Sequence, residues 1–242
     1  MIIITLILGA IAIFTSFIYI EKVLPRLLCT FVAGIILLGS ILGIVGNYYG
    51  HFGMHKVTTT TSQKIYSADT TGKTKMVLFQ PIGSAGKENV YIYAKSEKTK
   101  KVSHTKANEY THNKLTRVKS NGALLKTTKV RWQYKSNGYK FWFGIAGNNN
   151  KLVKSTNHFY VSKDWFVLST EQAKELKKQM SSKSFQAKAK EQATVYVESR
   201  MKAAITQDPS LMTDKSRQSQ LTQKFAAEYQ TKLLKETVSK IK

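Results

Sequence analysis

Two long stretches without a charged side chain open the sequence, separated by a short charged turn. Residues 2–20 and residues 27–47 contain no Asp, Glu, Lys or Arg. At a rise of about 1.5 Å per residue, a helix over either stretch approaches the ~30 Å hydrocarbon thickness of a bilayer. A backbone inside lipid must satisfy its own hydrogen bonds, which favours helices. Residues 1–49 are therefore predicted to form a two-helix transmembrane hairpin.

Two other interpretations of these stretches fit less well. A buried helical hairpin of a soluble protein would need two consecutive uncharged spans of this length in one core, which is rare. A secretory signal peptide would begin with basic residues and end at a small-residue cleavage site, whereas the first basic side chain is Lys22. Neither span holds an ionisable side chain suited to proton relay or ion conduction.

The turn between the spans gives an expected orientation. It covers residues 21–26 and carries Lys22 and Arg26. The positive-inside tendency places this turn in the cytoplasm and both termini outside. Lys56 and Lys64, which follow the second span, favour the opposite orientation. We expect a multi-pass cell-membrane protein with two spans and an extracytoplasmic bulk domain.

The second span contains a glycine pair at helical spacing. Gly39 and Gly43 form a G-x-x-x-G pattern, which favours close packing of one membrane helix on another, within the hairpin or on a partner protein. Glycine is also common in membrane helices generally. Both interpretations stay open. The first would suit an accessory subunit of a membrane transporter that packs through its hairpin.

The rest of the chain is strongly basic. The whole sequence has 38 Lys and Arg against 14 Asp and Glu, a net charge of +24. Such a field concentrates anionic partners near the protein and is screened by salt. A solvated, lysine-rich surface without a specific ligand is the alternative.

Alternation of polar and apolar residues predicts strands in residues 50–168. In residues 129–135 the apolar side chains point to one face and the basic ones to the other. Asn137-Gly138 then predicts a hairpin turn into a strand over residues 139–143. Asn121-Gly122 predicts another turn, between strands over residues 114–120 and 123–128. Together these segments predict a three-stranded antiparallel meander. Further strands are predicted over residues 57–63, 76–80, 89–95, 158–162 and 165–169, with the last two joined as a hairpin.

These strands predict an antiparallel β-rich domain, a small sandwich or barrel. Tyr91 and Tyr93 face away from the expected core. The expected core consists of the apolar side chains on the other face: Val90, Ile92, Val130, Trp132, Tyr134, Phe141, Phe143, Phe159, Val161, Phe166 and Leu168.

Residues 169–242 are predicted to be helical. Ser169 as N-cap with Gln172 three residues later fits a capping box. Asp208-Pro209 interrupts the helical pattern, because the residue before proline disfavours the helical conformation. This tail is expected to be a helical pair packed on the strand domain or on itself; the alternative is a helix that binds a partner or a membrane surface.

No arrangement of residues points to catalysis. The sequence lacks a G-x-S-x-G nucleophile turn and a phosphate-binding loop. His51 and His55 would supply only two ligands to a metal, and the single cysteine, Cys29, lies in a span. We expect no enzyme activity, no catalytic residue, no cofactor and no metal.

Charge is the remaining functional signal. The anion-facing surface is predicted to contain Lys129, Arg131, Lys135 and Lys140. Expected partners are the lipid bilayer, an anionic wall polymer or anionic lipid, and a membrane protein. Nucleic acid is not favoured, because no RNP-like motif accompanies the aromatic strands.

The layout resembles an uncharacterised family of small membrane proteins from lactic acid bacteria. The resemblance rests on two spans joined by the turn at residues 21–26 and on the Lys-, Thr- and Asn-rich, cysteine-free domain with aromatic strands. It implies a Gram-positive cell membrane and no known activity, and it transfers no functional residues. We expect a membrane-anchored protein with an α+β fold. Its expected ligand is anionic envelope material.

Overall fold

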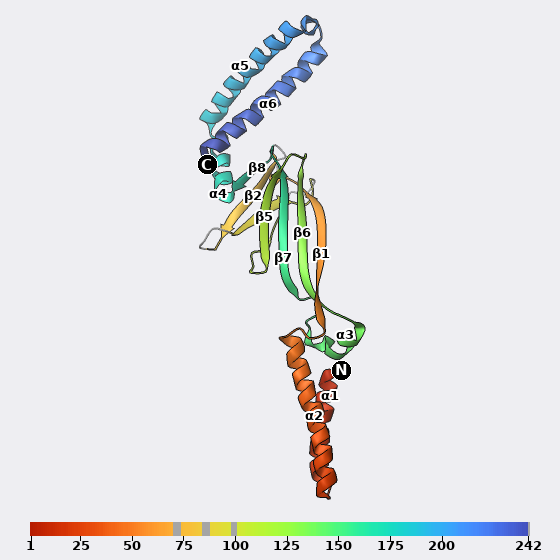
Figure 1. Ribbon diagram of the computed structural model, residues 1–242. Helices are drawn as coiled ribbons and strands as arrows, with labels where there is room; N and C mark the ends of the chain where they lie inside the picture. The colour runs from red at the N-terminus through yellow and green to blue at the C-terminus, as the bar shows by residue number, and fades with distance from the viewer. Residues whose placement is uncertain (70–73, 84–87, 98–100, 242) are drawn as a thin grey trace. The chain divides into compact units, whose positions relative to one another are not determined.

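A computed structural model describes residues 1–69, 74–83, 88–97 and 101–241. Contacts divide the chain into two compact units, each made of two separate segments (Figure 1). Unit 1 consists of Met1–Ile65 and Thr105–Lys163, and unit 2 consists of Tyr66–His104 and Asp164–Lys242.

Two apolar helices begin unit 1. α1 (Ile2–Tyr19) and α2 (Val23–Tyr48) are long and apolar enough to cross a membrane, and they pack as an antiparallel pair (Figure 1). A Cβ on Gly9 would lie 3.2 Å from the Leu37 amide nitrogen, and the hydroxyl oxygens of Thr5 and Ser40 are 3.1 Å apart. The predicted pair of helices is confirmed.

A mixed four-stranded sheet completes most of unit 1. Its strands are β1 (Met54–Ile65), β5 (Thr111–Val118), β6 (Ala123–Tyr134) and β7 (Leu152–Ser162), in the order β1-β6-β7-β5. β6 is antiparallel to both β1 and β7, whereas β5 and β7 are parallel. The predicted antiparallel meander is wrong, because Asn121-Gly122 connects β5 and β6, which are not neighbours in this sheet.

The segment after β6 is helical, which corrects the strand predicted over residues 139–143. α3 (Asn137–Phe143) and the 3-10 turn η1 (Gly144–Ala146) follow a cap in which the Ser136 hydroxyl accepts from the Tyr139 amide. Gly138 does not adopt the positive φ that a type I′ hairpin turn requires. Phe143 instead enters a cluster with Ile2, Met54 and Tyr134.

Unit 2 contains a second mixed sheet. Its strands are β2 (Met76–Ile82), β3 (Glu88–Ala94), β4 (Val102–His104) and β8 (Phe166–Ser169), in the order β4-β3-β2-β8. β8 lies parallel to β2. The predicted hairpin over residues 158–169 is therefore wrong, because β7 and β8 belong to different sheets.

The C-terminal part of unit 2 is helical, as predicted. It comprises α4 (Thr170–Ser181), α5 (Lys183–Gln207), the 3-10 turn η2 (Pro209–Met212) and α6 (Lys215–Ile241). The capping box at Ser169 and Gln172 is present. α5 and α6 form a helical pair (Figure 1), in which the Tyr229 hydroxyl donates to Gln192 Oε1 at 3.0 Å.

The predicted core is correct in its centre and wrong at two places. Five of its members are buried, namely Tyr134, Phe143, Phe159, Val161 and Leu168. On β3 the opposite face is inside, because Tyr91 and Tyr93 are buried while Val90 and Ile92 are half-buried. Phe141 is 59% exposed, since α3 turns it away from the cluster that holds Phe143.

Candidate functional site

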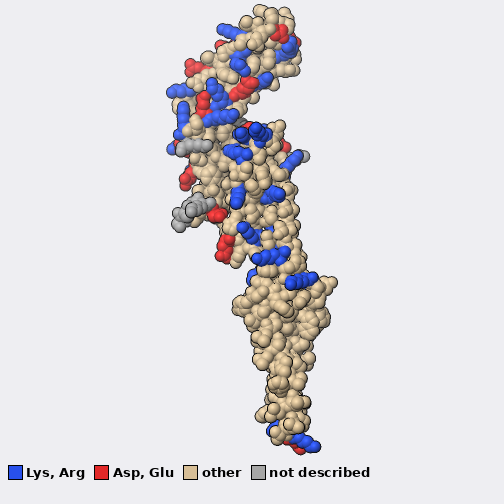
Figure 2. Space-filling model, viewed as in Figure 1, with Lys and Arg blue, Asp and Glu red and all other residues tan. Residues whose placement is uncertain are grey.

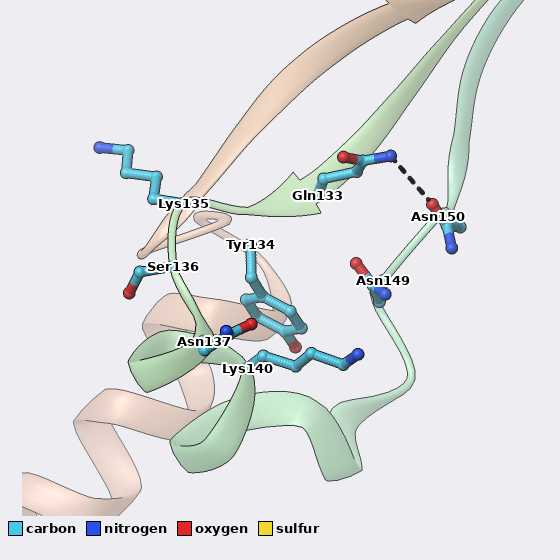
Figure 3. A pocket seen from close by; sticks show the side chains of 8 residues that line it. All are labelled: Gln133, Tyr134, Lys135, Ser136, Asn137, Lys140, Asn149 and Asn150. Atoms are coloured by element: carbon cyan, nitrogen blue, oxygen red, sulfur yellow. Dashed lines mark hydrogen bonds between the residues drawn. The ribbon is translucent and has the colours of Figure 1, made fainter.

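A basic pocket lies at the end of the unit 1 sheet, where β6 gives way to α3. Its volume is about 440 Å³. It is lined by Gln133, Tyr134, Lys135, Ser136, Asn137, Lys140, Asn149 and Asn150 (Figure 3).

One wall of the pocket depends on a glycine before β1. Gly53 has a φ of +76°, and a Cβ there would lie 2.2 Å from Tyr139 Cδ1. Only glycine fits both the positive φ and the close approach of the ring. The Gly53 carbonyl also accepts from the Lys135 amide at 2.9 Å. This contact and the Ser136 cap fix where Lys135 and Lys140 leave the backbone.

The opposite wall is the chain that returns to β7. Asn150 takes a φ of +63°, and its amide donates to the Trp132 carbonyl at 2.8 Å. The Arg131 guanidinium donates to the Asn150 carbonyl at 2.7 Å, and the Gln133 amide nitrogen donates to Asn150 Oδ1 at 3.3 Å (Figure 3). The Asn149–Asn150 segment is thus held against the end of β6.

A buried polar residue of α2 connects this region to the helix pair. Asn47 is fully buried and donates from Nδ2 to the Phe52 carbonyl at 2.8 Å. The Asn148 side chain donates to the Asn47 carbonyl at 3.3 Å. The Tyr134 hydroxyl donates to the Phe143 carbonyl at 2.8 Å. Burial raises the pKa of this hydroxyl above its ordinary value, against a smaller lowering by Asn47.

The pocket combines cationic groups with amides and hydroxyls. Lys140 extends along the pocket towards Asn149, whereas Lys135 points away from it (Figure 3). The residues that line it, all of them described by the structure, include no Asp or Glu. Ammonium groups and amide N–H donors suit a phosphate or carboxylate oxygen.

The surroundings of the pocket are also almost free of negative charge. The sequence of unit 1 contains just two acidic residues, Glu21 and Glu109. Figure 2 shows the helix pair without charged side chains except at its connecting tip, and Lys and Arg side chains over the strands. Unit 1 therefore presents a positive field that few carboxylates of its own offset.

The four predicted anion-facing residues are only partly gathered. Lys135 and Lys140 line the pocket. Arg131 is half-buried and supports its wall through Asn150. Lys129 is exposed on β6 but does not line the pocket. Sequence reasoning missed Gln133, Asn149 and Asn150; the run of three asparagines at residues 148–150 was the available signal.

The two glycines of α2 have different surroundings. A Cβ on Gly43 would lie 2.9 Å from Ile2 Cδ1 and 3.4 Å from Phe143 Cε1. A Cβ on Gly39 would have no atom within 4 Å. Gly43 therefore faces the packed start of α1, while Gly39 faces open space.

The histidines near the end of α2 do not form a metal site with each other. His51 has a φ of +55° and stacks on Trp132 with ring centroids 4.1 Å apart. His55 lies on β1 and is exposed. Within the described ranges of the chain, no group of three or more His, Cys, Asp or Glu side chains could hold a metal ion.

Comparison with known proteins gives one result. No curated protein and no solved structure matches this chain. The model of one family, described as Domain of unknown function (DUF4811), matches residues 22–176. That range includes α2, the strands of both sheets and the basic pocket. Since the match covers more than half of the sequence, the chain belongs to the DUF4811 family.

Proposed function

We propose that this protein is a membrane-anchored cell-envelope protein whose basic domain binds anionic envelope material on the extracytoplasmic side. The helix pair supports the anchor, because its large apolar side chains are exposed rather than packed in a core; Leu24 is 82% and Leu42 70% exposed. Contiguous apolar surface of this kind marks a contact with a partner or a membrane.

The observation that carries the ligand class is the pocket of Lys135 and Lys140 in a unit nearly free of acidic residues. Phosphate-rich polymers and anionic lipid headgroups both supply oxygens that such a pocket can bind. A lysine close to an anionic surface contributes about 1 kcal/mol. Lys140 extends along the pocket, and Lys135 borders the pocket but points outward. Together they supply a measurable share of binding without any catalytic group.

The experiment measures binding of inorganic polyphosphate, a soluble probe for phosphate-rich polymer, to the full-length protein in bilayers of neutral lipid. Lys135→Glu with Lys140→Glu should weaken binding at physiological salt by at least about tenfold. The matched control is Lys188→Glu with Lys190→Glu, which makes the same charge change at exposed positions of α5. Equal losses in the two variants, or no loss in the first, would reject the pocket as the binding site.

A further inference from the structure

Large apolar side chains are exposed where α2 meets α3 and β1. The most exposed are Tyr49 at 76%, Ile145 at 66% and Phe141 at 59%. We call this set the aromatic collar; it consists of Tyr48, Tyr49, Phe52, Phe141, Trp142 and Ile145. A contiguous exposed patch of large apolar residues typically marks a surface that contacts a protein or a membrane.

The collar is attached to a rigid cluster. Phe52 makes edge-to-face ring contacts with Tyr139 and Phe143, at centroid distances of 5.8 and 6.1 Å. Phe143 belongs to the buried cluster with Ile2 and Tyr134. Phe52 therefore connects the collar to a packed interior of unit 1.

The position of the collar along the helix pair matches a membrane boundary. The start of α1 packs beside α2, because Ile2 lies against Gly43, and the Met1 amino group donates to the Phe141 carbonyl at 3.0 Å. α3 thus lies at the end of the apolar pair. α2 has 26 residues, about 39 Å of helix, which exceeds the ~30 Å hydrocarbon thickness. Its last turns would lie in the interface, where Tyr and Trp are enriched.

Positive charge stands next to the collar. Lys140 directly precedes Phe141 on α3, and Lys151 Nζ lies 5.7 Å from the centre of the Tyr48 ring. Residues 110–163 contain no Asp or Glu. Aromatic and aliphatic side chains beside lysines suit the boundary between acyl chains and anionic headgroups.

We propose that α3 and η1, with the end of α2, form an in-plane seat on an anionic phospholipid bilayer. The aromatic collar enters the boundary between headgroups and acyl chains, and Lys140 lies at the level of the lipid phosphates. This proposal rests on the proposed membrane anchor and extends the membrane contact beyond the two spans to α3 and η1.

The test uses the emission of Trp142 in full-length protein reconstituted into phosphatidylcholine and phosphatidylglycerol vesicles. The emission of Trp142 is obtained by subtracting the spectrum of the Trp142→Phe variant from that of the wild type. Lipids brominated on the acyl chain serve as quenchers. Bromine near the headgroup end of the chain should remove most of this emission, and bromine near the terminal methyl much less. Aqueous iodide should quench it weakly.

Two further variants in the Trp142→Phe background keep the test independent of one position. Ile145→Trp lies in the collar and should show the same shallow quenching. Thr61→Trp is exposed on β1, about 23 Å along the strand from Met54, and should be insensitive to brominated lipid.

Flotation of the protein with vesicles after an alkaline wash tests the anchor separately. If the protein floats but brominated lipid does not quench the emission of Trp142 or of Ile145→Trp, the seat is overturned and the anchor is retained. Protein that does not float overturns both proposals. Quenching at Thr61→Trp equal to that at the collar also overturns the seat, because the contact would not be confined to α3 and η1.

Discussion

Asn47 lies fully buried in the last turn of α2, and its side chain donates to the Phe52 carbonyl. Asn47→Ala removes this bond and leaves the carbonyl without its partner. A hydrogen bond of this kind contributes about 0.5–1.5 kcal/mol to stability. We expect the free energy of unfolding of unit 1 in detergent to fall by that amount. Asn149→Ala, at an exposed position, should change it by less than about 0.5 kcal/mol.

Gly39 and Gly43 should respond differently to the same substitution. Gly43→Leu forces atoms into the space of Ile2 and Phe143, and overpacking costs about 1–3 kcal/mol. A Cβ on Gly39 has no neighbouring atom within 4 Å, so we expect Gly39→Leu to leave the thermal midpoint in detergent unchanged. Under the accessory-subunit hypothesis, Gly39→Leu would keep this midpoint but lose a co-purifying membrane protein. Equal destabilisation by both changes would contradict the assigned packing.

At the scale of elements, α3 shows why local pattern misassigned residues 139–143. A strand and a helix both place Tyr139 and Phe143 on one face, because i and i+4 coincide in periods of 2 and 3.6. Phe141 would share the face of Tyr139 in a strand but not in a helix, and it is exposed. The Ser136 cap and the contact of Tyr139 with Gly53 stabilise the helix. Gly53 lies far from α3 in the sequence, so the local pattern does not reveal this contact.

The parallel strand pairs have a similar cause. Residues 114–120 and 165–169 are predicted as strands, but their sequences carry no information about strand direction. β5 pairs with β7, and β8 pairs with β2. These partner strands lie elsewhere in the sequence, so the local pattern cannot identify them. For the same reason Lys135 and Lys140 could be selected from sequence, whereas Asn150 could not. Its place in the pocket depends on pairing with Trp132.

The connection between α5 and α6 should be sensitive to acid. Hydrogen bonds from Ser210, and the nearby Arg217 guanidinium, hold the pKa of the Asp208 carboxyl below its ordinary value. A carboxyl with a lowered pKa in the folded state stabilises the fold above its unfolded pKa, about 4. This contribution is lost as the pH falls through the folded value.

We therefore expect the Ser210 amide resonance to shift, and its protection from hydrogen exchange to fall, below about pH 4. Asp208→Asn keeps an oxygen acceptor but cannot ionise, so its Ser210 resonance should not follow this titration. An acid transition that is identical in the variant would assign the effect to another carboxyl.

At the scale of the whole molecule, the acidic residues are unevenly divided. Apart from Glu21 and Glu109, every Asp and Glu of the chain belongs to unit 2. The basic residues are shared by both units. Unit 1 therefore carries a net charge of +14 and unit 2 a net charge of +10, so the unit with the apolar helices is the more positive of the two. This arrangement suits a domain held beside an anionic surface, where each lysine adds to attraction.

The orientation of the chain provides a test at this scale. If the turn with Lys22 and Arg26 faces the cytoplasm, protease added to intact cells should remove the α5–α6 segment. Lys22→Glu with Arg26→Glu removes the charges that retain the turn, and we expect a smaller fraction of molecules to be cleaved. Lys56→Gln with Lys64→Gln lowers the opposing charge and should leave cleavage complete. A wild-type domain that is protected in intact cells but cleaved after lysis would place it in the cytoplasm. The anionic ligand would then have to be sought on the inner leaflet.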